Sequence, residues 1–330
     1  MDKCELKQFQ ISRGFTYCYY RYSDPNRTKP TLLFLHGFPS TKEDWVHQIE
    51  HFVPKGFSII AVDTLGYGGT SKPTEVIAYR VTDMAKDITE ILDFENERKV
   101  IVIAHDWGSG ISARMIDNHR DYLIAAVFLN VGYIPQPSGF NWEQAMKYTD
   151  LSFGYSTFGY WEFFGNVRDA HIITEKNIDS FYSLGFPNDP ELWRTDLCPR
   201  GKAQEWIEGN KQAPRAAYWD EETMRAHQRR LLSSGGLEAP FLYYRVYFTG
   251  VNNRPNPPSP EEMTFSTPTL LIPCSKDYVA LKELQIQRTR SFAQNLIVEE
   301  FDCGHWIMFE KPELLNERLA HFLDNLKLVE

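Results

Sequence analysis

The chain has 330 residues, of which 42% are hydrophobic and 14% aromatic, and it carries a formal net charge of -9 with a pI near 5.6. That length and apolar content can bury a sizeable core, which excludes a disordered or fibrous chain. The acidic balance argues against a nucleic-acid partner, because phosphate binding needs a basic surface.

The cysteines and the apolar runs of the sequence indicate the cellular compartment in which the protein is expected. The five cysteines are scattered and lack CxxC spacing, so the sequence predicts neither a disulfide framework nor a zinc site. No signal-peptide-like run opens the chain, and no stretch of about 18 apolar residues could span a bilayer. We therefore expect a cytoplasmic protein without membrane insertion, and the sequence specifies no oligomeric state.

Apolar runs typical of strands alternate with helical patterns along the chain. Several of these runs are apolar at nearly every position, which suits strands covered on both faces of a parallel sheet. Helices are expected at 81–94 and 312–326, where apolar residues recur at spacings of three and four. The alternation predicts an α/β fold, with a mostly parallel sheet and helices on both faces. The expected strands are 15–23, 31–37, 57–63, 99–105, 123–130, 269–274 and 296–301.

The alternation stops after Leu129. From about Tyr133 to Thr267 the sequence is aromatic, helical and rich in loops, and the segment NNRPNPPSPEEM leads back to a strand. The simplest arrangement is a helical cap inserted between two strands, with the proline-rich segment as its return linker. We expect residues 1–132 and 268–330 to form the α/β core and residues 133–267 to form the cap.

The stretch AHDWGSG joins an expected strand to an expected helix and contains several candidate nucleophiles. A sharp strand-to-helix turn needs small residues two positions before and two positions after the nucleophile. Asp106 meets this requirement through Ala104 and Gly108. Ser109 does not, because Trp107 occupies the position two before it. This disfavours a serine esterase.

A carboxylate nucleophile implies a particular chemistry. Aspartate has a reference pKa of about 3.9, so it is ionised at neutral pH and attacks without the help of a base. It suits displacement at an sp³ carbon, which gives an ester, and hydrolysis of that ester needs a base and an oxyanion hole. His105, one residue from the apex of the turn, is expected to orient the turn rather than react.

Residues for the hydrolysis follow other strands. His305 follows the last strand and precedes the final helix, where an α/β-hydrolase carries its general base. Asp277 follows the preceding strand and can orient that imidazole, and the order Asp106, Asp277, His305 is the nucleophile, acid, base order of this fold. In the segment HGFP, the backbone N–H of Phe38 is expected beside that of Trp107 as the oxyanion hole.

Together, the motifs HGFP, GYGGTS, HDWG, KD at Asp277 and GHW at His305 resemble those of epoxide hydrolases of the α/β-hydrolase fold. They span nearly the whole chain. The resemblance implies a soluble epoxide hydrolase without the N-terminal phosphatase domain that some members carry. It also implies that the reaction needs no metal or organic cofactor.

The resemblance further implies two cap tyrosines that stabilise the opening epoxide oxygen. A phenol suits this role because its pKa of about 10 keeps it protonated at neutral pH. The tyrosines implied are Tyr160, in FGYWEFF, and Tyr244, in FLYYRVY, with Tyr243 as the alternative for the second. Three residues of the HGFP and GHW motifs are expected to line the substrate pocket, namely His36, Pro39 and Trp306.

These observations predict an enzyme that converts small apolar epoxides to vicinal diols through a hydroxyalkyl ester on Asp106. A haloalkane dehalogenase is the nearest alternative, but that family typically has Asn or Glu where this chain has Phe38, and a halide needs such donors. A catalytically idle hydrolase fold that acts as a small-molecule receptor is the alternative outside enzymes. No member of the predicted triad is missing, which disfavours the receptor.

Overall fold

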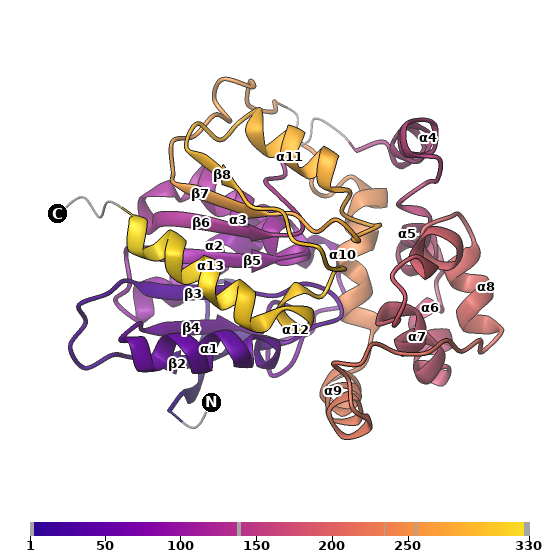
Figure 1. The fold of residues 1–330 in the computed structure, drawn as a ribbon, viewed down its shortest axis with the longest axis horizontal. Helices are drawn as coiled ribbons and strands as arrows, with labels where there is room; N and C mark the ends of the chain where they lie inside the picture. The colour runs from indigo at the N-terminus through magenta and orange to yellow at the C-terminus, as the bar shows by residue number, and fades with distance from the viewer. Residues whose placement is uncertain (1–2, 137–139, 234, 255, 327–330) are drawn as a thin grey trace.

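The computed structural model describes residues 3–136, 140–233, 235–254 and 256–326. One twisted sheet runs through the molecule, with helices around it (Figure 1). Its strands, in chain order, are β1 (Glu5–Gln10), β2 (Thr16–Tyr22), β3 (Thr31–Leu35), β4 (Ile59–Val62), β5 (Val100–His105), β6 (Leu123–Leu129), β7 (Thr269–Ile272) and β8 (Leu296–Val298).

The sheet has the mostly parallel arrangement that the sequence predicts. Its spatial order is β1-β2-β4-β3-β5-β6-β7-β8. The β1–β2 and β2–β4 pairs are antiparallel, and all other neighbours are parallel. Strands β3, β4, β5 and β7 are buried at every residue, as strands with both faces covered must be. The α/β-hydrolase fold class is confirmed.

Helices cover both faces of the sheet. In Figure 1, α1 (Val46–Phe52) and α13 (Pro312–Asn325) lie together in front of the sheet, whereas α2 (Val81–Phe94) and α3 (Trp107–Asn118) lie together behind it. None of the helices in the described ranges combines the length and the apolar character that a bilayer crossing requires. Two further helices outside residues 133–267 are α11 (Lys282–Arg290) and α12 (Ile307–Glu310).

Every strand expected from the sequence is present, although several are shorter than their apolar runs. The expected helix at 81–94 is confirmed, and the one at 312–326 ends one residue earlier. Strand β1 is not among the strands expected from the sequence. Its sequence, ELKQFQ, is largely polar because β1 is an exposed edge strand, held by its antiparallel pairing with β2.

The chain between β6 and β7 forms a group of helices to the right of the sheet in Figure 1. Within this group, α10 (Glu238–Thr249) lies nearest the sheet and packs against α5 (Gly159–Asn166). The assignment of 133–267 as a cap, with 1–132 and 268–330 as the core, stays a proposal. The other helices of the group are α4 (Trp142–Phe153), α6 (Ala170–Lys176), α7 (Ile178–Gly185), α8 (Lys202–Glu208) and α9 (Glu221–Ser233).

The turn from β5 to α3 is sharp and strained. Asp106 lies at its apex with φ 51° and ψ -122°, a conformation that L-residues rarely adopt. The turn also brings α3 very close to β3, since a Cβ atom on Gly108 would lie 2.2 Å from the carbonyl oxygen of Leu35. Ala104, on the other side of the apex, is fully buried. The sequence requirement for small residues around Asp106 thus has a steric basis.

Two glycines of α3 should respond differently to replacement by alanine. Gly108→Ala should lower the free energy of unfolding by roughly 1–3 kcal/mol, because the new methyl group meets backbone that cannot move aside. Gly110→Ala is the control, since its Cβ would meet nothing closer than 3.8 Å. It should be neutral or stabilise the protein by up to about 1 kcal/mol. Thermal melting followed by circular dichroism measures both, and equal melting temperatures would contradict the close approach at Gly108.

Candidate active site

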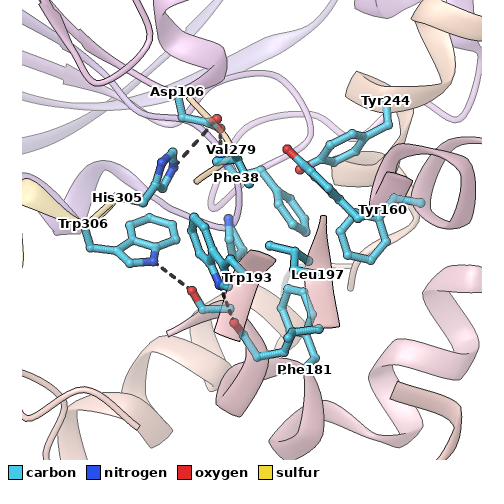
Figure 2. A pocket seen from close by; sticks show the side chains of 14 residues that line it. Phe38, Asp106, Tyr160, Phe181, Trp193, Leu197, Tyr244, Val279, His305 and Trp306 are labelled. Carbon is cyan, nitrogen blue, oxygen red and sulfur yellow. Dashed lines mark hydrogen bonds and ion pairs between the residues drawn. The ribbon is translucent and has the colours of Figure 1, made fainter. Parts of the chain in front are cut away.

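Three side chains from three strand ends meet above the sheet. Asp106 follows β5, Asp277 follows β7, and His305 lies between β8 and α12. The Nδ1 atom of His305 is 2.7 Å from Oδ2 of Asp277, and its Nε2 atom is 3.9 Å from Oδ2 of Asp106. Figure 2 shows the imidazole directed at the Asp106 carboxylate. The three predicted triad residues are therefore close together in the fold.

The Asp277 carboxylate is fully buried and receives several hydrogen bonds. Oδ1 accepts from the backbone N–H groups of Val279 and Ala280, at 3.0 and 2.9 Å. Oδ2 accepts from the side-chain amide of Asn130, at 2.7 Å, as well as from His305. Burial alone would raise the pKa of Asp277, but His305 and these donors hold it below its usual value. Asp277 is thus a fixed negative charge beside the imidazole.

Asn130 is a site residue that the sequence analysis misses. It directly follows β6, the neighbour of β5, and its backbone has a φ of 63°. Its amide holds one oxygen of Asp277 at the correct place for His305. One feature of the sequence could have identified Asn130: it is a polar residue immediately after a buried parallel strand, at the same edge of the sheet as Asp106.

The imidazole of His305 is prepared to act as a base. Burial opposes protonation, but the carboxylates of Asp277 and Asp106 outweigh burial and raise the pKa of His305. The hydrogen bond to Asp277 assigns the Nδ1 atom as the donor, so the neutral ring has its Nε2 lone pair on the side of Asp106. A neutral His305 can therefore accept a proton next to Asp106.

His105 supports the backbone of this arrangement. Its Nε2 lies 2.9 Å from the carbonyl oxygen of His305, and the two rings pack with centroids 4.6 Å apart. Burial, with the nearby His305, lowers the pKa of His105 to about 3, so this ring is neutral and donates from Nε2. His105 is not among the cavity-lining residues, which agrees with an orienting role.

Two backbone N–H groups hold the Asp106 carboxylate. The N–H of Phe38 donates to Oδ1 at 2.8 Å, and the N–H of Trp107 also hydrogen-bonds this carboxylate. Gly37 permits this approach, since a Cβ there would lie 2.2 Å from Oδ1 of Asp106. Burial raises the pKa of Asp106 above its usual value, and His305 with the two N–H groups opposes that rise. The backbone N–H groups of Phe38 and Trp107 therefore both contact the Asp106 carboxylate.

Ser109 does not reach the cavity at Asp106. Its side chain is fully buried in the first turn of α3, and its hydroxyl has no hydrogen-bond partner among the described atoms. It does not line the cavity at Asp106. The reactive group of AHDWGSG that is open to a ligand is the Asp106 carboxylate, whose side chain is 18% exposed.

An aromatic-walled cavity opens above Asp106 (Figure 2). His305 lies on one side of the carboxylate, and Tyr160 of α5 and Tyr244 of α10 lie across the cavity with their hydroxyls turned toward it. The two tyrosine rings are 5.8 Å apart between centroids. Burial, with the nearby Asp106 carboxylate, raises the pKa of both phenols well above the ordinary value. Both therefore remain hydrogen-bond donors at neutral pH.

The structure separates Tyr244 from its sequence neighbour. The hydroxyl of Tyr243 donates to the carbonyl oxygen of Leu65 at 2.8 Å, and its ring packs between Tyr67 and Tyr79. Tyr243 does not line the cavity at Asp106, whereas Tyr244 does. Of the two alternatives for the second tyrosine, only Tyr244 faces the carboxylate.

The expectation that His36 lines the substrate pocket is wrong. Its ring is buried behind the HGFP loop, where Nδ1 donates to the carbonyl of Gly37 and Nε2 accepts from the N–H of Thr64. His36 thus ties the loop to the end of β4 and does not reach the cavity. Pro39 and Trp306, the other two residues expected there, do line the cavity.

The described residues contain no group of three or more histidine, cysteine, aspartate or glutamate side chains placed to hold a metal ion. The triad carboxylates are instead occupied by His305 and by N–H donors. The arrangement therefore combines a carboxylate, a base oriented by a second carboxylate, two backbone donors and two phenols around one cavity.

Comparisons with known proteins identify the fold family of the chain. A family model described as alpha/beta hydrolase fold matches residues 30–312. Epoxide hydrolase 1 of Caenorhabditis elegans is 23% identical over 296 residues, which is 90% of this chain but 65% of that protein, less than two thirds of its length. Epoxide hydrolase 4 of Mus musculus is 24% identical over 327 residues, covering 93% of this chain and 79% of that protein.

Solved structures show the same fold. An epoxide hydrolase from an endophytic Streptomyces superposes with a TM-score of 0.82 at 22% identity, covering 99% of this chain and 97% of that chain. Epoxide Hydrolase A from Mycobacterium thermoresistibile superposes with a TM-score of 0.79 at 21% identity, over 99% and 100% of the two chains.

The pKa of His305 should depend on Asp277. Asp277→Asn removes the negative charge that most favours the imidazolium, so the pKa of His305 should fall, and the neutral ring should persist to lower pH. Folding stability linked to protonated His305 is present at low pH and is lost as pH rises through the folded pKa. The variant should lose this contribution. Titration of the imidazole by NMR measures the shift.

Asp302→Asn is the matched control for this titration. Asp302 is an exposed carboxylate three residues before His305 and pairs with Lys276. Its removal should leave the pKa of His305 unchanged. An equal shift in both variants would show that Asp277 has no special influence on the imidazole.

Proposed function

Because the chain belongs to the alpha/beta hydrolase fold family, we propose that it is an epoxide hydrolase that works through a covalent ester on Asp106. The observation that carries the proposal is the cavity in which two protonated phenols face a carboxylate. An epoxide between them would meet a nucleophile at carbon and donors at oxygen. The resemblance to named epoxide hydrolases supports this substrate class.

In the first step, Oδ2 of Asp106 attacks one epoxide carbon. Oδ2 is the freer oxygen, because Oδ1 is held by the N–H of Phe38 and Oδ2 is 3.9 Å from His305. The new C–O bond forms as the epoxide C–O bond breaks, and the departing oxygen receives a hydrogen bond and then a proton from Tyr160 or Tyr244. The product is a hydroxyalkyl ester on Asp106.

In the second step, His305 activates a water molecule. Nε2 accepts a proton from the water as its oxygen adds to the carboxyl carbon of Asp106. The negative charge then develops on Oδ1, to which the N–H of Phe38 already donates, and the N–H of Trp107 is a second donor to the same carboxylate. Collapse breaks the bond between the carboxyl carbon and Oδ2, and Oδ2 takes back the proton that His305 accepted from water, so the diol leaves with Oδ2. The aspartate keeps an oxygen from water, and its new carboxyl group releases a proton that replaces, by way of solvent, the one given up by the tyrosine in the first step.

The same cavity disfavours halide release. A halide leaving group needs N–H donors, and those of the two tryptophans that line this cavity are engaged: the indole N–H of Trp193 donates to the carbonyl of Leu184, and that of Trp306 donates to the carbonyl of Gly185. Phe38 offers only an apolar ring at the position where a dehalogenase typically carries a polar side chain. The donors that face Asp106 are phenols, which suit an oxygen that must be protonated.

His305→Gln should trap the ester. Alkylation does not use His305, whereas hydrolysis does, so the variant should accumulate the intermediate after mixing with styrene oxide. Mass spectrometry of the digested protein should show the mass of the epoxide added to the peptide that contains Asp106. The double variant with Asp106→Ala should carry no adduct. Unmodified peptide in the single variant, or an adduct on Ser109, would refute the mechanism.

Replacing the two pocket tyrosines should slow alkylation specifically. The combined Tyr160→Phe and Tyr244→Phe variant should lose roughly 10²- to 10⁴-fold in the alkylation rate, the usual contribution of general acid catalysis. Stopped-flow tryptophan fluorescence after mixing with styrene oxide measures this rate. Tyr243→Phe is the control: it loses a buried hydrogen bond worth about 1 kcal/mol of stability, but it should alkylate normally. A normal rate in the double variant would remove both tyrosines from the mechanism.

A further inference from the structure

The cavity at Asp106 has a second arm. A neighbouring cavity shares Asp106 and Tyr160 with the one in Figure 2 and continues past Trp107 and Tyr247 to Arg288 on α11. We call this space, from Asp106 to Arg288, the side arm. A further cavity shares Tyr247 and Arg288 with the side arm, so open space continues beyond the guanidinium.

The walls of the side arm are largely aromatic, and its end is positively charged. Trp107, Trp161 and Tyr247 pack together along it, with the Trp161 and Tyr247 rings 5.0 Å apart between centroids. An apolar chain would fit such walls, whereas the half-buried guanidinium of Arg288 loses part of its hydration there, which an accompanying anion would replace. The positive charge of Arg288 at the end of the side arm therefore needs a partner.

No described residue forms an ion pair with Arg288. One of its terminal nitrogens donates to the side-chain oxygen of Gln285, and its Nε has no hydrogen-bond partner among the described atoms. Burial lowers the pKa of Arg288 to about 10, so the group still carries its charge at neutral pH. A positive charge and an unused N–H donor thus lie together at the end of the arm.

Arg114, the neighbouring buried arginine, shows the contrast. It forms an ion pair with Asp117 at 2.9 Å. Asp117 also accepts hydrogen bonds from the hydroxyl of Tyr133, at 2.7 Å, and from the amide of Gln136, at 3.1 Å. The charge of Arg114 is therefore balanced by an acid whose oxygens are already occupied, and the charge of Arg288 is not.

Further unused donors surround the same space. The side-chain nitrogen of Asn252 and the Nε of Arg114 line the cavity beyond the side arm, and neither has a hydrogen-bond partner among the described atoms. Together with Arg288 they present N–H groups to one volume. Buried donors need acceptors, and these donors share one volume in which water or the oxygens of a ligand can reach them.

We propose that Arg288 is a specificity-determining residue that binds a carboxylate on the substrate. This inference rests on the proposed function: the epoxide lies at Asp106, an apolar spacer follows the side arm, and the carboxylate pairs with the guanidinium. A carboxylate suits the site because a guanidinium binds its two oxygens side by side, and because one uncompensated positive charge matches one negative charge. The preferred substrates are therefore epoxides that carry a carboxylic acid on an apolar chain.

The test compares the terminal epoxide of undecenoic acid with its methyl ester, which differs mainly in charge. In the unmodified protein, KM for the acid should be lower by about 10- to 100-fold, the value of one charge-assisted hydrogen-bonded contact. Arg288→Gln should raise KM for the acid to the level of the ester, with little change in kcat for either. Arg288→Lys should restore part of the preference because it keeps the charge.

Arg290→Gln is the matched control, since Arg290 is an exposed arginine at the end of the same helix. It should leave both KM values unchanged. Equal KM values for acid and ester in the unmodified protein would overturn the proposal without any variant. Acetate added to the reaction with the methyl ester tests whether the site binds a free anion instead of the carboxylate of a substrate. A rise in turnover of the ester would show that it binds a free anion and would overturn the proposal.

Calorimetric binding of undecanoate, which has no epoxide, keeps this inference distinct from the proposed function. Undecanoate should bind the unmodified protein at least tenfold more tightly than it binds the Arg288→Gln variant, about the lower end of the KM difference expected between acid and ester. If neither epoxide yields a diol but this difference is present, the proposed reaction fails and the carboxylate site stands. If diols form but undecanoate binds both proteins equally, the reaction stands and the carboxylate site fails.

Discussion

The approach of α3 to β3 at Gly108 is the constraint on which the site depends. Only a residue without a Cβ can lie where the Leu35 carbonyl leaves no room, so α3 begins directly behind β5. Because the helix begins so close to the strand, the backbone at Asp106 adopts a strained conformation. This conformation projects the Asp106 carboxylate above the edge of the sheet. The same turn aims the N–H of Trp107 at the carboxylate, so one steric constraint positions both the reactive group and one of its donors.

Burial then determines which groups carry charge. Asp277 is ionised because His305 and N–H donors outweigh its loss of water, and His305 responds to that charge with a raised pKa. Burial has a different result for the phenols of Tyr160 and Tyr244: it raises their pKa, so they keep their protons and stay uncharged. Asp277 and the two phenols are thus held in the protonation states that the proposed reaction needs, and the raised pKa makes His305 a stronger base, without a metal ion in that scheme.

The sheet and the triad could be predicted from sequence because both depend on local pattern. Parallel strands are apolar runs, and their carboxyl ends converge at one edge, so Asp106, Asp277 and His305 had to lie near one another once the strands were identified. The edge strand β1 was not predicted, because its polar residues are stabilised as a strand by pairing with β2. That pairing cannot be recognised from the segment ELKQFQ alone.

Other features depend on contacts between distant segments. His36 shares a motif with Phe38, yet its hydrogen bond to Thr64 turns its ring away from the cavity. The sequence left Tyr243 and Tyr244 as alternatives because a helix turns each neighbouring side chain by about 100° and only packing decides which one faces inward. Arg288 lies in a helix with several other charged residues, and nothing in that pattern separates the one that turns toward a cavity.

The placement of the phenols has a consequence for the order of events. Tyr160 and Tyr244 belong to α5 and α10, between β6 and β7, whereas Asp106, Asp277, His305 and both backbone donors belong to the chain around the sheet. Under the proposed mechanism, bond formation to carbon needs both groups of elements in contact, but ester hydrolysis uses the sheet-side residues alone. Under that mechanism, a molecule whose α5 and α10 have moved away from Asp106 would begin a turnover far more slowly, yet it could finish one already begun.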